Sequence, residues 1–398
     1  MPQKEIAGPL NPLPERIYYV DWLRNLAVLL LVPFHTARIF DIWEPFYAKN
    51  NQLSNGLSYF IAFCGPWHMP LLFLLAGAAS SFALGLRSGR QYAGERFKRL
   101  LIPFLFGLLV VIPPQTYLGA LTHAKFSGSF FEYYPHFFEF PSEENSDYFG
   151  AFGFGHLWFI FFLFLFSVIA LPLFLSLKKE AGKRLMAKLA AISGKGGIIF
   201  LWAIPLAIVG ALPEIGGKNF FFFITLFIYG YFLMTDGRLQ EVLDRYKTIA
   251  LALGITAMII TLVIYIQDIR WPKYSTGDIL FHFLRNFNTW FWLMALMGFG
   301  KRYLDFKTRG LQYTTEAAYP FYILHQTVII IVGFFVVQWS AGLGLKFLII
   351  AITSLGVILL IYDAVIRRMN LLRFLFGMKL VKKALQEKAK EQGVGAFQ

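Results

Sequence analysis

Long apolar segments recur along this whole chain, and they decide which folds are open to it. Stretches long enough to cross a hydrocarbon core of about 30 Å lie at Trp22–Phe40, Ser58–Leu84, Leu100–Ala120, His156–Ser176, Gly197–Pro213, Lys218–Thr235, Thr248–Gln267, Asp278–Phe299, Glu316–Gln338 and Leu343–Val365. Because 57% of the 398 residues are hydrophobic and only 15% are charged, an ordinary soluble domain is excluded. The sequence predicts an all-α, polytopic transmembrane bundle of about ten spans.

The basic residues alternate with these segments. Most of the 37 Lys and Arg residues lie in the N-terminal segment, the C-terminal tail and four loops on the same predicted side of the membrane. By the positive-inside rule that side is cytoplasmic, so we expect cytoplasmic N- and C-termini. The net charge of +14 therefore reflects topology, and no nucleic-acid partner is expected.

The predicted domain organisation has three parts. Residues 1–21 form a cytoplasmic N-terminal segment, residues 22–365 form the membrane domain, and residues 366–398 form a basic cytoplasmic tail in contact with solvent or lipid headgroups. The first twenty residues lack an apolar core, so we expect no cleaved signal peptide. The single cysteine, Cys64, excludes an intrachain disulfide and a cysteine-based metal site, and no metal is expected.

Arg24 and His35 are ionisable residues within the first apolar segment, where such side chains are rare and usually functional. Eleven residues of α-helix turn to within about 20° of the starting direction and rise about 16.5 Å. Both side chains therefore share one helix face, with the arginine near one membrane surface and the histidine deep inside. This geometry suits an anionic ligand held at the surface while its reactive end reaches the imidazole.

A second cationic group precedes the third apolar segment. Arg96 and Arg99 are one helical turn apart at the predicted cytoplasmic boundary. Two guanidinium groups on one face form a fork for a phosphate-rich ligand, because each donates several hydrogen bonds. The alternative is that they are topology signals whose side chains extend to lipid headgroups.

Two further histidines lie at or within predicted spans. His325 follows Tyr322 by one helical turn, and such a pair is more often a packing hydrogen bond between helices than a catalytic base. His156 and Trp158 begin the fourth span at the predicted outer interface, where an anchoring role is the default interpretation. We regard these residues as candidates for substrate contact or structural support.

Arg285 forms a polar helix face with His282 and Thr289 in the eighth predicted span and has no acidic residue within one turn. It needs a partner from another helix, a ligand or a water-filled cavity. Asp363, near the end of the last span, is a candidate partner for Arg24 or for the Arg96/Arg99 pair. A local ion pair between Asp363 and Arg367 is the alternative.

Several of these residues stand in motifs that occur together in one known family. The motifs are Tyr19-Val-Asp-Trp-Leu-Arg24 with His35, Met69-Pro-Leu-Leu-Phe-Leu-Leu-Ala-Gly77, Arg96-x-x-Arg99-x-x-Ile-Pro103, His156-Leu-Trp158 and Tyr319-x-x-Tyr322-x-x-His325. This pattern, spread from about Tyr18 to Lys383, resembles the acyltransferase-3 family of integral membrane acyltransferases. Within the family it is most similar to the branch of the osmoregulated periplasmic glucan succinyltransferase.

The resemblance implies a multi-pass enzyme of the bacterial inner membrane with no permanently bound cofactor. Its co-substrate would be acyl-coenzyme A on the cytoplasmic side, and its acceptor a hydroxyl of a glycan or lipid-linked saccharide across the membrane. It also implies that Arg24, His35, Arg96 and Arg99 are the functional positions. The family more often has Ser-Gly where this chain has Ala76-Gly77, and Arg285 is not expected in the succinyltransferase, so the acyl group stays open between acetyl and succinyl.

The expected mechanism agrees with the helix geometry. With His35 as general base, a sugar hydroxyl from one side is deprotonated as it attacks a thioester from the other. An acyl-histidine intermediate is the variant left open, and the sequence sets no oligomeric state. The competing class is a secondary transporter with buried His and Arg as a proton or substrate relay, although the two halves show no matching broken helices.

Overall fold

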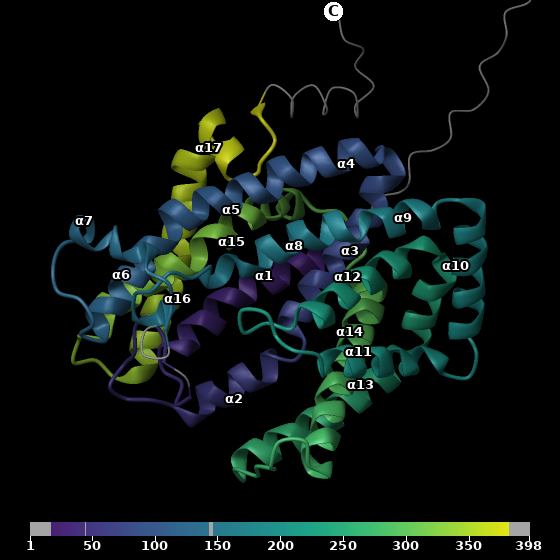
Figure 1. Ribbon diagram of the computed structural model, residues 1–398, viewed down its shortest axis with the longest axis horizontal. Helices are drawn as coiled ribbons and strands as arrows, with labels where there is room; N and C mark the ends of the chain where they lie inside the picture. The colour runs from purple at the N-terminus through teal and green to yellow at the C-terminus, as the bar shows by residue number, and fades with distance from the viewer. Residues whose placement is uncertain (1–16, 44, 143–145, 382–398) are drawn as a thin grey trace, which may run out of the picture.

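The protein is a bundle of helices, seen here in a computed structural model that describes residues 17–43, 45–142 and 146–381 (Figure 1). No strand occurs among these residues. The longer α-helices are α1 (Tyr18–Arg38), α3 (His68–Leu86), α10 (Glu180–Ser193), α12 (Phe220–Thr235), α13 (Gly237–Ile266), α14 (Thr276–Tyr303), α15 (Arg309–Val336) and α16 (Leu343–Ile361). The shorter ones are α2 (Asn55–Cys64), α4 (Gly89–Arg96), α5 (Ile102–Phe106), α6 (Ile112–Thr122), α7 (Phe130–Tyr133), α8 (Trp158–Ile169), α9 (Leu171–Leu177), α11 (Ala203–Gly210) and α17 (Asn370–Leu375).

Short segments of other helix types connect several of these elements. Three are π-helical: η1 (Phe97–Leu101), η2 (Gly107–Val111) and η7 (Tyr362–Ile366). Four are 3₁₀-helical: η3 (His136–Phe138), η4 (Asp147–Phe149), η5 (Gly155–Leu157) and η6 (Ile198–Trp202). Segments η1, α5, η2 and α6 continue α4, so that residues 89–122 form one long helical stretch.

The all-α prediction is confirmed, whereas the count of ten spans is not established. Five helical stretches are long and apolar enough to cross a membrane, and two bent helix pairs raise the number to seven. One pair bends by 46° between α8 and α9, where Pro172 is the second residue of α9, and the other bends by 116° between α10 and the η6–α11 segment. Polar side chains interrupt α1 and α14, and α12 has only 16 residues, so these elements do not meet the same criterion.

Helices α3 and α12 approach each other at two glycines. A Cβ atom on Gly77 would lie 1.8 Å from the carbonyl oxygen of Phe227, and one on Gly230 would lie 1.8 Å from that of Leu74. Only glycine permits this backbone contact, which is a common way for membrane helices to pack. The motif that ends in Gly77 therefore fixes a helix crossing.

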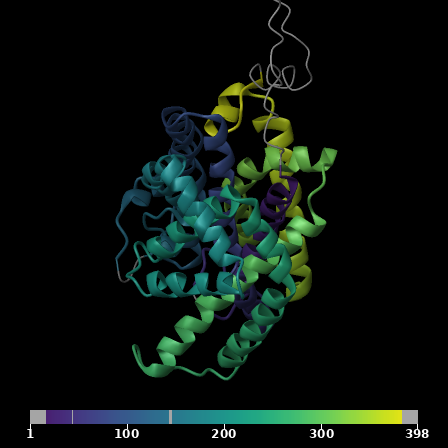
Figure 2. The same cartoon turned by 90° about the vertical axis from the view of Figure 1, so that its right-hand side faces the viewer.

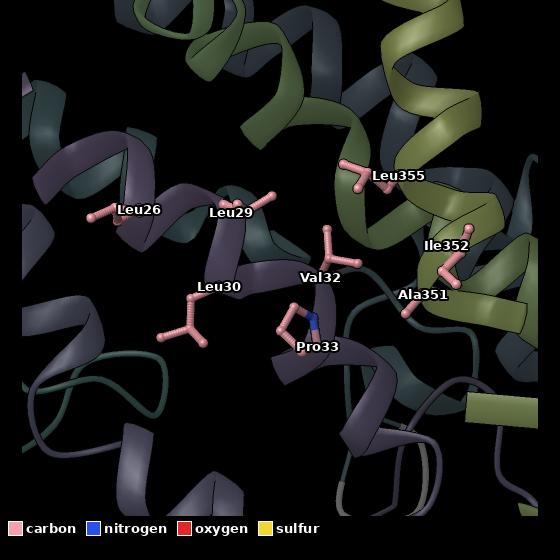
Figure 3. A pocket seen from close by; sticks show the side chains of 8 residues that line it. All are labelled: Leu26, Leu29, Leu30, Val32, Pro33, Ala351, Ile352 and Leu355. Carbon is pink, nitrogen blue, oxygen red and sulfur yellow. The ribbon is translucent and has the colours of Figure 1, made fainter. Parts of the chain in front are cut away.

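The bundle has an extension and an apolar pocket, and neither holds the candidate site. Helices α13 and α14 form an antiparallel hairpin that projects beyond the other helices in both views (Figures 1 and 2). A pocket of about 390 Å³ lies between α1 and α16, lined by Leu, Val, Ile, Pro and Ala side chains (Figure 3). Because no lining side chain can form a hydrogen bond, this pocket is not suited to a polar substrate.

Part of the predicted basic tail is integrated into the fold. The buried Arg373 side chain forms an ion pair with Glu316 at 2.9 Å and donates hydrogen bonds to the carbonyl oxygens of Arg367 and Lys379. Gly377, at φ +68°, packs on the ring of Tyr319. The segment up to residue 381 therefore packs against the end of the bundle next to η1 and α5, whereas residues 1–16 and 382–398 lie outside the described part of the chain.

Candidate active site

Three histidines from distant parts of the chain meet inside the bundle. His35 lies near the end of α1, His156 in η5 and His325 in α15. The ring centroids of His35 and His325 are 5.0 Å apart, and those of His156 and His325 are 4.8 Å apart. We call these three residues the histidine cluster. Two histidines that the sequence assigned to interfacial anchoring and helix packing thus lie beside the proposed catalytic base.

Hydrogen bonds to backbone carbonyls determine the tautomers of two of the rings. His156 donates from Nε2 to the carbonyl oxygen of Ile323 at 2.8 Å, and His325 donates from Nδ1 to that of Tyr322 at 2.6 Å. Each neutral ring then has its other nitrogen as a proton acceptor. Within the described part of the chain, His156 Nδ1, His325 Nε2 and His35 Nδ1 are buried without a hydrogen-bond partner. Buried unsatisfied nitrogens gathered in one place indicate a site for a ligand or a reacting group.

Helix α15 places the residues that support the cluster. The hydroxyl of the buried Tyr322 donates to the carbonyl oxygen of His156 and so ties η5 to α15. Tyr319 and His325 are six residues apart in this helix, which corresponds to a rise of about 9 Å. The helix therefore connects the histidine cluster with the region of Tyr319.

The Arg96/Arg99 pair lies near Tyr319. Arg96 ends α4, and Arg99 lies in the π-helical segment η1, a type of segment that is frequent at functional sites. The Arg96 guanidinium carbon is 4.6 Å from the ring centroid of Tyr92, and its Nη2 is 3.4 Å from Ser80 Oγ. Tyr319 is within electrostatic range of both arginines. The arginines therefore lie near Tyr319, which precedes His325 by six residues in α15.

Arg24 and Asp363 each form an ion pair close in sequence. Arg24 Nη2 is 2.6 Å from Asp21 Oδ1, and the arginine side chain is 32% exposed. Asp363 accepts a hydrogen bond from the Tyr313 hydroxyl at 2.7 Å and pairs with Arg367 at 3.3 Å. Asp363 thus occupies the local arrangement with Arg367, and these contacts do not join it to Arg24.

Arg285 and Trp158 lie outside the cluster. The exposed Arg285 side chain has its guanidinium carbon 5.9 Å from the ring centroid of Phe281 in the same helix. These contacts place Arg285 on α14, outside the histidine cluster. Trp158 packs against Phe73 and Phe223 with Lys218 Nζ 5.5 Å from its ring centroid, and therefore belongs to an aromatic core.

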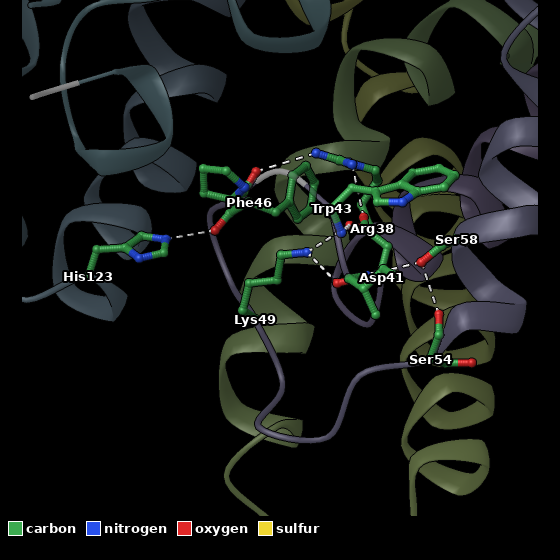
Figure 4. Close-up of polar contacts among 10 residues, drawn as sticks. Arg38, Asp41, Trp43, Phe46, Lys49, Ser54, Ser58 and His123 are labelled. Atoms are coloured by element: carbon green, nitrogen blue, oxygen red, sulfur yellow. Dashed lines mark hydrogen bonds and ion pairs between the residues drawn. The ribbon is translucent and has the colours of Figure 1, made fainter. Parts of the chain in front are cut away.

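The loop after α1 packs on His35 through the ring of Phe46, a feature not predicted from the sequence, and polar contacts within the loop hold it in place (Figure 4). Fully buried Asp41 forms ion pairs with Arg38 at 2.9 Å and with Lys49 at 3.0 Å. These contacts hold the described residues of the loop between α1 and α2 and place the ring of Phe46 nearly parallel to that of His35, with centroids 6.2 Å apart and an interplanar angle of 17°. The acidic residue three positions after Arg38 was the available sequence signal.

The arrangement favours proton transfer and anion binding by side chains. Neutral imidazoles with free nitrogens act as general bases, and guanidinium groups hold phosphates. Among the described residues, no group of three or more His, Cys, Asp or Glu side chains is placed to hold a metal ion.

Comparison with known proteins adds a family and named relatives. The acyltransferase domain of the acyltransferase-3 family matches residues 17–363. Three similar proteins are called glucans biosynthesis protein C, from Escherichia coli O17:K52:H18 (strain UMN026 / ExPEC), Shigella dysenteriae serotype 1 (strain Sd197) and Escherichia coli (strain K12). Each is 24% identical over 399 residues, covering 96% of this chain and 99% of the relative. No solved structure matches the chain.

Proposed function

Because the chain belongs to the acyltransferase-3 family of membrane acyltransferases, we propose that it moves an acetyl or succinyl group from acyl-coenzyme A to a hydroxyl of a glucan or related saccharide. The observation that carries this proposal is the histidine cluster, whose three free ring nitrogens lie buried together. The names of the relatives favour a glucan acceptor. The protein would act in the bacterial cytoplasmic membrane, with both termini and the donor on the cytoplasmic side.

The reaction transfers one acyl group and one proton. His35 removes the proton of the acceptor hydroxyl while its oxygen attacks the thioester carbonyl carbon. The carbon–sulfur bond then breaks, and the leaving thiolate takes the proton from the His35 imidazolium, which gives an ester and free coenzyme A. His156 and His325 are neutral neighbours in the tautomers set by their carbonyl partners, so they surround His35 with acceptor nitrogens.

The donor would be held by its phosphates. Arg96 and Arg99 offer guanidinium donors near Tyr319. From there the thioester arm of the donor would extend along α15, which rises about 9 Å between Tyr319 and His325, to reach the cluster. Arg24, which pairs with Asp21, stays a candidate third contact because its side chain is partly exposed.

Reconstitution into proteoliposomes tests this function against the transporter alternative. Purified protein receives acetyl- or succinyl-coenzyme A with a labelled acyl group on one side and a glucan oligosaccharide on the other. We expect an alkali-labile label on the oligosaccharide and stoichiometric release of coenzyme A. Label that crosses the bilayer without ester formation would contradict the proposal and favour a transporter. Release of coenzyme A before acceptor is added, in an amount equal to the protein, would identify the acyl-histidine route.

A further inference from the structure

A buried glutamine at the edge of the histidine cluster has no assigned role. Gln115 in α6 is completely buried. Its Oε1 accepts a hydrogen bond from the Thr327 hydroxyl at 3.2 Å and lies 3.5 Å from Gln326 Nε2. Its Nε2, by contrast, forms no hydrogen bond of normal geometry among the described residues, although it lies close enough to the Tyr47 hydroxyl to interact with it. Burying an amide donor without a well-formed hydrogen bond is unfavourable, so this nitrogen needs an explanation.

Gln115 Nε2 is directed at the turn that carries His156. A Cβ atom on Gly155 would lie 2.4 Å from Gln115 Nε2 and 3.5 Å from the Tyr47 hydroxyl. Gly155 has a φ of +47°, so both the space and the backbone conformation favour glycine there. His156 follows directly, and the amide therefore lies beside the histidine cluster.

Tyr47 connects this polar group with the loop that precedes His156. The fully buried Tyr47 donates a hydrogen bond from its hydroxyl to Asp147 Oδ2 at 2.8 Å. Its neighbour Phe46 stacks on His35, so the two residues of this loop contact both the base and the amide region. Asp147 lies in η4, in the loop that precedes His156, where burial raises the pKa of its carboxyl.

A planar amide, a phenol and a carboxylate among aromatic rings are the groups that bind a polyhydroxylated ligand. Tyr148 packs edge-on against Tyr47, with ring centroids 4.9 Å apart, and also contacts Phe46. We propose that Gln115 is an acceptor-binding residue, which donates from Nε2 to an oxygen of a saccharide and, with Tyr47 and Asp147 behind it, brings one hydroxyl to His35. This inference rests on the proposed function and specifies its acceptor site.

The replacement Gln115→Met tests the inference, since it keeps the side-chain length and removes the amide. Gln338→Met, at an exposed position beyond the end of α15, is the matched control. Binding of a glucan oligosaccharide is measured by titration calorimetry without donor, and acceptor KM is measured with labelled acyl-coenzyme A. We expect both acceptor constants to rise about tenfold in Gln115→Met, as for the loss of one hydrogen bond. Coenzyme A affinity and the melting temperature should match those of the control.

Unchanged acceptor constants in a folded Gln115→Met protein would overturn the inference while leaving the proposed function intact. Equal losses of acceptor and coenzyme A affinity would also overturn it, because they indicate a structural role. If Gln115→Met does not fold, Tyr47→Phe is tested instead, because it removes only the hydroxyl. Weaker oligosaccharide binding by this variant is expected. Unchanged binding contradicts the proposed site. Wild-type protein that transfers no acyl group would instead contradict the proposed function itself.

Discussion

Replacing Asp41 by asparagine should release the loop that packs on His35. The carboxylate is fully buried and faces Arg38 and Lys49, whose side chains are only 10% and 18% exposed. Removing one partner of a buried ion pair costs about 3–5 kcal/mol. Because Arg38 also donates to the Pro45 carbonyl and Lys49 to the Asp41 carbonyl, we expect the lower end, about 3 kcal/mol. The equilibrium for local opening of the loop should then rise roughly a hundredfold.

Hydrogen exchange followed by mass spectrometry measures this opening directly. Peptides that cover residues 39–54 should exchange about a hundredfold faster in Asp41→Asn, while peptides from α13 stay unchanged. Acyl transfer should fall, because Phe46 no longer fixes the ring of His35. Asp268→Asn, which breaks an exposed pair with Arg270, is the control and should have no measurable effect. Unaltered exchange of residues 39–54 in Asp41→Asn would refute the idea that these ion pairs hold the loop.

Three other predictions concern the donor, the pH dependence and the helix crossing. The double change Arg96→Lys/Arg99→Lys keeps the charge and loses the bidentate geometry, so coenzyme A affinity by calorimetry should drop about tenfold; unchanged affinity would make both residues topology signals. Because the pKa of Asp147 is raised in the folded state, its protonation stabilises the fold below the ordinary value of 3.8, and this contribution is lost as the pH rises through the raised value. Asp147→Asn should abolish that decline in melting temperature, and an identical pH profile would contradict the assignment. Gly77→Ala should lower stability by about 1–3 kcal/mol or abolish folding, whereas Gly85→Ala, which faces open space in the same helix, should not; equal melting temperatures would refute the tight crossing.

The apolar segments were sufficient to predict the all-α class, and five motifs taken together were sufficient to identify the family. Helix periodicity could not bring His35, His156 and His325 together, because these residues are more than a hundred positions apart and meet only through tertiary packing. Taken one helix at a time, His156 looked like an interfacial anchor and His325 like a packing residue. Gln115 gave no signal, because a single glutamine within an apolar helix carries no motif.

Hydropathy did not show which way the side chain of Arg285 faces. Arg285 was placed in a span from the apolar residues around it, yet its side chain is exposed on α14, in the hairpin that projects from the bundle. Composition cannot distinguish a helix face inside the bundle from one on a projecting hairpin. Asp41 directly follows the first predicted span, and the sequence does not indicate that its side chain is buried. Only the folded loop shows this burial and the ion pair with Arg38.

The catalytic role of His35 is the central claim, and the His35→Ala protein in proteoliposomes tests it most directly. Removing a general base should lower acyl transfer by about 10²–10⁴-fold, while coenzyme A affinity and the melting temperature stay close to those of the wild type. His282→Ala is the matched control, since that histidine binds the carbonyl oxygen of Ala207 on α11 outside the cluster, and it should retain transfer. Transfer by folded His35→Ala at more than a tenth of the wild-type rate would contradict the account.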